Sequence, residues 1–265
     1  MSAAKIAEHA ASAGERIIIT GATGNAGSGI LTAALASPLI SGVTVISRKP
    51  PYITHPKLTT ILLAPPDYPE GFDVKEVPPS LLERLKGHSA VIWALGISQT
   101  QVNQQDYIKI THDYTDTFAR AFSSLGTSSN PFRFVFVSGE GADQNEKGRA
   151  LFSRIKGRTE KELKAMETDS FRTISVRPGG ILPMPEHRQY MSTLLSVTWR
   201  VAGAIFNTVY PKAVIESVDL GVACVEIAAG KNGKGWDKRT EQGWVPNPVL
   251  KELAEELKRA GGARA

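Results

Sequence analysis

An apolar run that breaks directly into a glycine-rich turn constrains this chain more than any other feature of its sequence. Residues 16–20 read RIIIT, and the next seven residues read GATGNAG. An alanine-rich segment follows, whose apolar residues recur at helical spacing until Ser37-Pro38. A buried strand, a turn with little side-chain bulk and a helix N-terminus together suit a pyrophosphate, because the helix dipole stabilises the anion. The pattern therefore predicts a dinucleotide site.

This glycine turn has a structural alternative, because its G-x-x-G-x-x-G spacing is looser than the common G-x-G-x-x-G form. The strand before it and the helix after it favour nucleotide binding, and a merely structural turn would not need glycine at positions 21, 24, 27 and 29 together. The residues expected to bind the coenzyme here are Gly21, Thr23, Gly24, Asn25, Ala26 and Gly27.

A second predicted strand, residues 43–46, ends in Ser47-Arg48-Lys49. In a first βαβ unit this position meets the adenosine ribose of the dinucleotide. NAD favours a carboxylate there, whereas the guanidinium of Arg48 and the ammonium of Lys49 suit a ribose 2′-phosphate. We therefore expect NADP(H) as the coenzyme. The alternative is a solvated basic turn before Pro50-Pro51, because exposed Arg and Lys are common.

These features resemble the short-chain dehydrogenase/reductase superfamily, in particular its atypical, extended-like branch, which opens with GATGxxG and includes NmrA-like and Tat-interacting-protein-like members. The resemblance spans most of the chain and rests, in order, on residues 21–27, 47–49, 90–96, 134–138, Lys156 and residues 177–179. It implies an α/β fold, a doubly wound parallel Rossmann sheet with a small C-terminal lid on the substrate side. The alternation of apolar strands and helical patterns agrees with that topology.

The length and composition of the chain fit one α/β domain. The 265 residues are 42% hydrophobic, which is enough for one large sheet core. We expect a flexible N-terminal arm at residues 1–15 and an NAD(P)-binding Rossmann core at residues 16–180. Residues 181–265 are expected to form the lid and the closing strand and helices of the same domain.

The resemblance also implies a catalytic arrangement of serine, tyrosine and lysine. Ser138 ends the predicted fifth strand, and Lys156 holds the lysine position of a Tyr-x-x-x-Lys pattern, but Phe152 stands where the tyrosine is expected. In the superfamily the lysine lowers the pKa of the phenol and binds the nicotinamide ribose, the serine orients the substrate carbonyl, and the phenol supplies the proton. Phe152 has no proton to give, so another group must act; the candidates are Tyr114, Tyr190, Ser138, Lys156 and a bound water.

Two further segments are expected beside the nicotinamide half of the coenzyme. Leu95 and Gly96 end the predicted fourth strand, where glycine lets the backbone approach a ligand. By resemblance, Pro178 and Gly179 form the turn whose backbone passes the nicotinamide carboxamide. Arg177 before them could bind a substrate anion or backbone carbonyls, and its donor capacity suits both.

Two functions from different classes follow. The first is an NADP(H)-dependent oxidoreductase that reduces a small carbonyl compound or a conjugated alkene, with Ser138 and Lys156 as catalytic residues. The second is a non-catalytic NADP(H)-sensing regulatory or scaffold protein, which the loss of the phenol at Phe152 favours. A substituted acid lowers the rate of proton transfer without abolishing it, so the enzyme is the preferred hypothesis.

Other ligand classes are poorly supported by the sequence. The five histidines are scattered and Cys224 is the only cysteine, so we expect no metal site. The net charge of +5 favours anionic ligands but is too low for a nucleic-acid binder, and residues 231–239 are interpreted as a solvated basic hairpin. We expect a small-molecule substrate, and a homodimer or another protein partner is compatible with the sequence.

The expected location is the cytoplasm. Residues 1–15 lack the apolar stretch of a secretory signal, and their two glutamates argue against a transit peptide. Residues 190–209 form the longest apolar segment, but Arg200 and several hydroxyl side chains within it argue against an integral membrane span. We interpret this segment as a helix packed against the fold.

Overall fold

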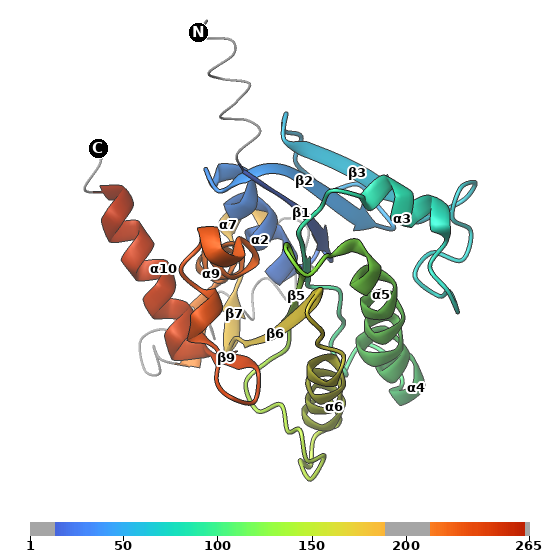
Figure 1. The fold of residues 1–265 in the computed structure, drawn as a ribbon. Helices are drawn as coiled ribbons and strands as arrows, with labels where there is room; N and C mark the ends of the chain where they lie inside the picture. Colours follow the sequence, from blue (N-terminus) through green and yellow to red (C-terminus); the bar gives the residue numbers. More distant parts are fainter. Residues whose placement is uncertain (1–13, 189–212, 263–265) are drawn as a thin grey trace, which may run out of the picture.

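The computed structural model describes residues 14–188 and 213–262, which form a parallel sheet with helices on both faces (Figure 1). Seven strands lie in the order β3-β2-β1-β4-β5-β6-β9, and all neighbours are parallel. The expected doubly wound α/β sheet is confirmed. The strands are β1 (Glu15–Thr20), β2 (Ile40–Ser47), β3 (Leu58–Leu62), β4 (Ala90–Trp93), β5 (Phe132–Val137), β6 (Phe171–Arg177) and β9 (Trp244–Pro246).

Two layers of helices cover the sheet, and the alternation of side chains along β1 shows why. On one face lie α2 (Asn25–Ala36), α9 (Ser217–Ala228) and α10 (Asn247–Gly262); on the other lie α3 (Pro79–Leu85), α5 (Tyr114–Phe122) and α6 (Leu151–Ala165) (Figure 1). Ile17 and Ile19 belong to the hydrophobic cluster under the first set, whereas Ile18 belongs to the cluster under the second. Successive strand residues point to opposite faces, so an unbroken apolar strand fills both layers.

Residues 104–125, whose apolar residues recur at helical spacing, form a divided helix in the structure. It consists of α4 (Gln104–Ile108), a π-helical turn η1 (Lys109–Asp113), α5 and a 3-10 turn η2 (Ser123–Leu125). The apolar residues of this segment form one buried face, because Tyr107, Phe118 and Phe122 are all buried. Helical periodicity does not reveal the widened turn, which is common at functional sites.

Three boundaries differ from the sequence-based prediction. Glu15 belongs to β1 and its carboxylate pairs with Arg133 at 2.8 Å, so it is not part of a loose arm. The fourth strand ends at Trp93, not at Gly96. The expected basic hairpin consists of 3-10 turns, η4 (Gly230–Asn232) and η5 (Trp236–Lys238), and Arg239 after them binds Glu167 at 2.8 Å.

The segments after β6 close the described part of the fold. A short second sheet pairs β7 (Gly180–Leu182) with β8 (Val214–Glu216), and α7 (Pro185–Arg188) follows β7. Much of the expected lid, including residues 190–209, lies outside the described residues, as do residues 1–13 of the expected arm. Among the described helices, none has the length and hydropathy needed to cross a membrane. Cys224 is fully buried, and burial raises the pKa of its thiol.

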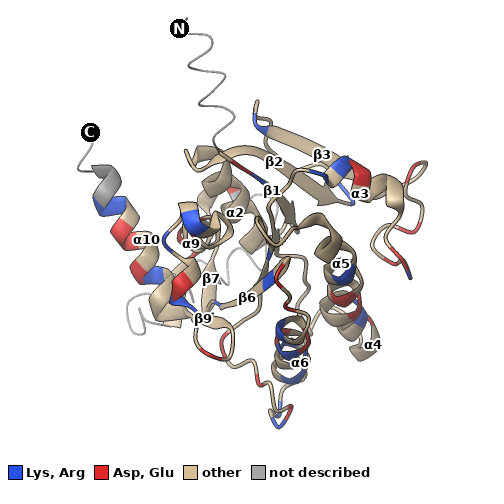
Figure 2. Cartoon of the chain, in the orientation of Figure 1, with Lys and Arg blue, Asp and Glu red and all other residues tan. Residues whose placement is uncertain are grey.

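Charged residues of both signs are frequent on α6 and α10. Figure 2 shows Lys and Arg interspersed with Asp and Glu along α6 and α10. Mixed charges of this kind are typical of solvated helix faces, and they agree with the modest net charge of +5.

Helices α2 and α9 cross so closely that glycine is required at the contact. A β-carbon at Gly29 would lie 2.3 Å from the carbonyl of Ser217, and one at Gly221 would lie 2.5 Å from the carbonyl oxygen of Gly29. Each glycine therefore lets the other helix approach. This crossing matters for the site, because α2 begins at the glycine turn.

Gly29→Ala is predicted to lower the free energy of unfolding by about 2 kcal/mol or more, because backbone atoms cannot yield to the added methyl group. Helix propensity alone predicts the opposite sign, a gain of about 1 kcal/mol. Urea denaturation measures the difference, and Gly42→Ala in β2 is the control, since its β-carbon would meet only ordinary contacts at 3.6 Å. A Gly29→Ala protein at least as stable as the wild type would contradict this account of the crossing.

Candidate coenzyme and substrate cleft

A cleft of about 890 Å³ lies where the chain leaves β1, β4, β5 and β6. Ligands of doubly wound sheets bind at this carboxyl edge of the strands. The structure brings most of the predicted site residues together in its wall: Gly24, Asn25, Ala26, Gly27, Leu95, Gly96, Ser138, Lys156, Pro178 and Gly179. Gly21, Thr23, Arg48 and Lys49 are not among the residues that line it.

The first and third glycines of the turn shape the cleft from behind. Gly21 has a φ of +68°, and a β-carbon on it would lie 2.3 Å from the carbonyl oxygen of Ala94. A β-carbon on Gly27 would lie 2.0 Å from the carbonyl oxygen of Gly21. Glycine at these two positions therefore lets the backbones of β1, β4 and α2 approach each other directly, which a residue with a β-carbon would not allow.

The N-terminus of α2 opens toward the cleft. Gly24 is its N-cap, and no side chain caps the helix, so its first amide groups are not satisfied by a capping side chain. Asn25 donates a hydrogen bond from Nδ2 to the carbonyl of Ile181 at 2.9 Å, while its Oδ1 is buried with no partner in the part of the chain that the structure describes. Unoccupied amides and an unpaired buried acceptor are the groups that a pyrophosphate and ribose hydroxyls would satisfy.

Arg48 and Lys49 are exposed directly after β2. The Ser47 hydroxyl donates to the carbonyl of Lys49 at 2.5 Å, which fixes the turn. Among the residues that the structure describes, neither cation forms an ion pair or side-chain hydrogen bond. Both side chains therefore remain available to an anion at this end of β2.

Ser138 and Lys156 meet in the cleft wall. Lys156 donates from Nζ to the backbone carbonyl of Ser138 at 2.7 Å. The Ser138 side chain is buried, and within residues 14–188 and 213–262 its hydroxyl has no hydrogen-bond partner. Desolvation by the surrounding protein lowers the pKa of Lys156 to about 8, although Glu160 opposes the shift. The site therefore holds a free hydroxyl beside an amine that titrates close to physiological pH.

Phe152 also lines the cleft, one helical turn before Lys156 on α6. Tyr114, one of the expected substitutes for the missing phenol, does not line the cleft; its ring stacks on Phe72 with centroids 6.3 Å apart, and burial raises its pKa. Tyr190 lies outside the described residues. Of the side chains considered as proton donors, Ser138 and Lys156 are the ones that the structure places in the cleft.

Arg177 adopts neither of the two roles considered for it. Its guanidinium binds the buried carboxylate of Glu160, with Nε 2.9 Å from Oε1, and lies over the ring of Trp244 at 4.2 Å. Gln144 also donates to Glu160 at 3.0 Å. Arg177 thus neutralises a buried charge. A glutamate on an otherwise polar helix gave no signal of burial in the sequence.

Sequence reasoning missed several residues of the cleft, including Ser98, Gln101, Thr111 and Glu140. Thr111 is only 3% exposed and stands in the π-helical turn η1, which periodicity could not locate. Glu140 lies close to Ser138 along the sequence, and this proximity to a predicted site residue is the signal that could have identified it. In the described part of the chain, no group of three His, Cys, Asp or Glu could hold a metal ion.

No protein-family model matches this chain. It is 27% identical over 214 residues to the mitochondrial protein fmp52 of Emericella nidulans, covering 79% of this chain and 85% of that protein. It is 30% identical over 191 residues to the mitochondrial protein FMP52 of Chaetomium globosum, covering 72% of this chain and 76% of the relative.

Solved structures show the same fold at low sequence identity. A short chain dehydrogenase family protein from Francisella tularensis subsp. tularensis SCHU S4 superposes with a TM-score of 0.62 at 13% identity, covering 88% of this chain and 97% of that one. MoeE5 in complex with UDP-glucose and NAD superposes with a TM-score of 0.58 at 15% identity, covering 92% and 82%. The chain therefore has the Rossmann fold of short-chain dehydrogenases.

The expected cytoplasmic location is wrong. The similar proteins of Emericella nidulans, Aspergillus fumigatus and Chaetomium globosum are all named as mitochondrial. The expectation depended on the composition of residues 1–15, and a composition that lacks one kind of targeting signal does not identify a compartment.

Arg177→Met is predicted to lower the free energy of unfolding by about 3 kcal/mol, because it leaves the carboxylate of Glu160 buried without its cation. Urea denaturation measures the loss. Arg120→Met is the matched control: its pair with Asp116 is exposed, so about 0.5 kcal/mol or less is expected. Equal stability of Arg177→Met and the wild type would mean that the guanidinium is free for a ligand.

Proposed function

The chain belongs to the FMP52 family, and from this premise and the cleft we propose that it is an NADP(H)-dependent oxidoreductase that reduces a small carbonyl compound or a conjugated alkene. The observation that carries the proposal is the free Ser138 hydroxyl beside Lys156, in the same cleft as the glycine turn. We place the protein in mitochondria, as its relatives are named.

The residues present fit a dinucleotide. The uncapped α2 N-terminus would bind the pyrophosphate, and the backbone near Gly24 leaves room for it. Arg48 and Lys49 would bind the 2′-phosphate that distinguishes NADP from NAD. Leu95, Gly96, Pro178 and Gly179 would border the nicotinamide half. MoeE5, which has the same fold, was solved with NAD, which supports a coenzyme of this class.

The chemistry that a bound NADPH supplies is donation of a hydride. The chain must then orient the substrate and provide a proton. Ser138 Oγ, which has no hydrogen-bond partner among the described residues, would donate a hydrogen bond to the substrate carbonyl oxygen. Lys156 Nζ would hold the proton that the missing phenol cannot supply, since a pKa of about 8 is close to the optimum for a general acid at neutral pH.

The exposed Glu140 disfavours a substrate anion in its part of the cleft. Glu140 lines it with an exposed carboxylate and forms no ion pair with any residue that the structure describes. Phe152 adds an apolar ring. A carboxylate substrate would meet repulsion from Glu140, whereas a hydroxyl or ammonium group would find an acceptor.

The second candidate function is a non-catalytic NADP(H) sensor, and Phe152 is the observation that favours it. A sensor requires different partner affinity with and without nucleotide. Affinity capture from mitochondrial extract, with apo and NADPH-loaded protein, tests it. An unchanged set of captured proteins would count against a sensor.

Arg48→Glu is predicted to weaken NADPH binding by about tenfold to a hundredfold, because a charge-assisted contact to the 2′-phosphate becomes a repulsion. NADH, which lacks that phosphate, should bind with unchanged affinity. Calorimetry of both coenzymes measures the effect, with Lys231→Glu at η4 as a control for the same change in net charge. Equal losses for NADH and NADPH would refute the 2′-phosphate assignment.

Phe152→Tyr is predicted to raise the rate of NADPH-dependent reduction by about a hundredfold, because it restores a phenol beside Lys156. A panel of ketones and enones, followed by NADPH absorbance, measures this, and the double variant Phe152→Tyr with Lys156→Ala is the control.

With the wild type, the rate should fall as the pH rises through about 8, where Lys156 loses its proton. Turnover by the Phe152→Tyr protein alone, with none by the wild type, would favour the sensor.

A further inference from the structure

We propose that His112, held as an imidazolium between Asp113 and Glu162, is a positioning residue that fixes α6 against the η1 wall of the cleft. The inference rests on the proposed function in one respect, namely that α6 carries Lys156 into the coenzyme site. The protonation of His112 and its clamp on α6 stand on geometry that does not depend on any ligand.

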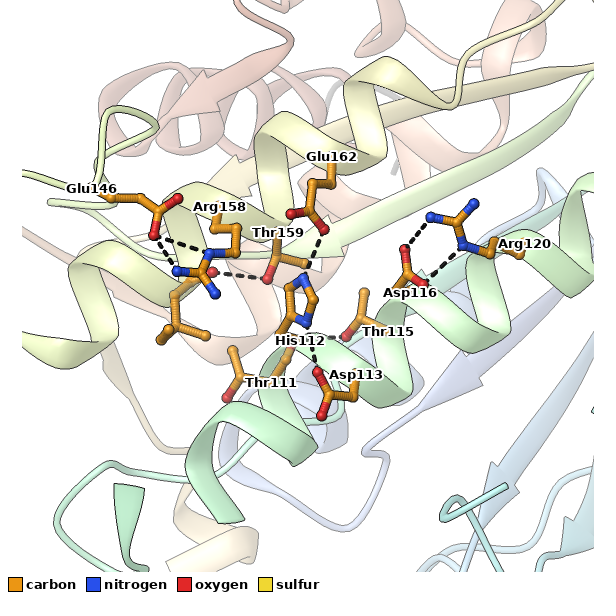
Figure 3. A network of polar contacts seen from close by, with 11 residues as sticks. Thr111, His112, Asp113, Thr115, Asp116, Arg120, Glu146, Arg158, Thr159 and Glu162 are labelled. Carbon is orange, nitrogen blue, oxygen red and sulfur yellow. Dashed lines mark hydrogen bonds and ion pairs between the residues drawn. The ribbon is translucent and has the colours of Figure 1, made fainter. Parts of the chain in front are cut away.

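The two contacts of His112 require two protons on its ring. Nδ1 lies 2.7 Å from Oδ1 of Asp113, and Nε2 lies 2.7 Å from Oε2 of Glu162 (Figure 3). Ionised carboxylates only accept hydrogen bonds, and a neutral imidazole can donate from one nitrogen only. Placing the second proton on a carboxylate would leave the more basic group unprotonated. His112 therefore donates to both carboxylates as an imidazolium.

The charged groups around His112 are otherwise occupied with one another. On α5, Asp116 pairs with Arg120 at 2.9 Å, and Arg158 of α6 donates from Nε to Glu146 at 2.9 Å (Figure 3). Lys109 of η1 pairs with Asp73 at 2.5 Å. His112 is thus the cation in direct contact with Asp113 and Glu162. Burial favours the neutral ring, but the hydrogen bonds to the two carboxylates outweigh it and raise the pKa of His112.

The clamp joins two walls of the cleft. Thr111 lines the cleft from η1, and the next residue, His112, faces α6. On α6, Phe152 and Lys156 line the cleft, and Glu162 lies further along the same helix. Consecutive helical residues point in different directions, so one turn can present Thr111 to the ligand and His112 to the helix behind it. Releasing Glu162 would remove one of the contacts that fix α6 relative to Thr111.

Rising pH should loosen this clamp. The pKa of His112 in the folded protein is raised above 6.5. The ion pairs of His112 with Asp113 and Glu162 therefore make their full contribution to stability below pH 6.5. Their contribution is lost as the pH rises through the folded-state pKa, since the neutral ring keeps one donor and its other nitrogen faces a carboxylate oxygen.

The first test measures the pKa of the His112 ring. NMR titration of the histidine rings, with His112→Gln to assign the signal, should show a pKa above 6.5 for His112 and a lower one in Glu162→Gln. The stability lost in His112→Gln should shrink as the pH rises above that pKa. His55→Gln, which replaces an exposed histidine, is the control. An unshifted titration, or a pH-independent loss of stability, would overturn the proposal.

The second test measures coupling to the cleft. It compares the NADPH dissociation constant of His112→Gln with that of the wild type as a ratio. The titration of Lys156 affects both proteins and therefore cancels in this ratio. The ratio should be about two- to fivefold at pH 6, as for loss of one partly exposed ion pair, and approach one at pH 9. His112→Lys, which keeps a cation, should restore wild-type binding at pH 6.

Each outcome of the second test bears on the proposal. A ratio of one at both pH values would show that the clamp does not position the site. Equal losses in His112→Gln and His112→Lys would show that ring shape matters and charge does not. If no variant binds NADPH, the proposed function fails, while the titration and unfolding measurements still decide the clamp.

Discussion

The backbone contact at the glycine turn is the constraint on which the rest of the structure depends. Gly27 of α2 touches the carbonyl of Gly21, and Gly21 touches the carbonyl of Ala94 after β4. With side chains there, the first helix could not start where it does, and its N-terminus would not face the carboxyl edge of the sheet. The Gly29–Gly221 crossing supports the same helix from behind, because it lets α9 approach α2.

The topology of the sheet then brings the candidate site residues together. Parallel strands deliver their carboxyl ends to one edge, so Ser138 after β5 and Pro178 after β6 meet the glycine turn across one cleft. Lys156 reaches the same cleft from α6 and keeps a lowered pKa because protein surrounds it. The replacement of tyrosine by Phe152 removes one acid from this constellation, but it leaves a hydroxyl and a titratable amine in place.

Much of this could be predicted from sequence, and the failures have physical reasons. The apolar strands and the glycine turn are local patterns, so the fold and ten cleft residues follow from residues such as Ile17–Ile19 and Gly24. The partner of Arg177 could not be predicted, because it depends on Glu160 of the preceding helix α6 being buried against the end of β6. The roles of Thr111 and His112 depend on a π-helical turn, which changes the direction of side chains without changing the apolar spacing.

Calorimetric titration of the purified wild-type protein with NADPH tests the central claim most directly. We predict a saturable binding isotherm with one site per chain, and weaker binding of NADH. Absence of saturable heat with either coenzyme, on protein whose cooperative unfolding shows that it is folded, would contradict the account.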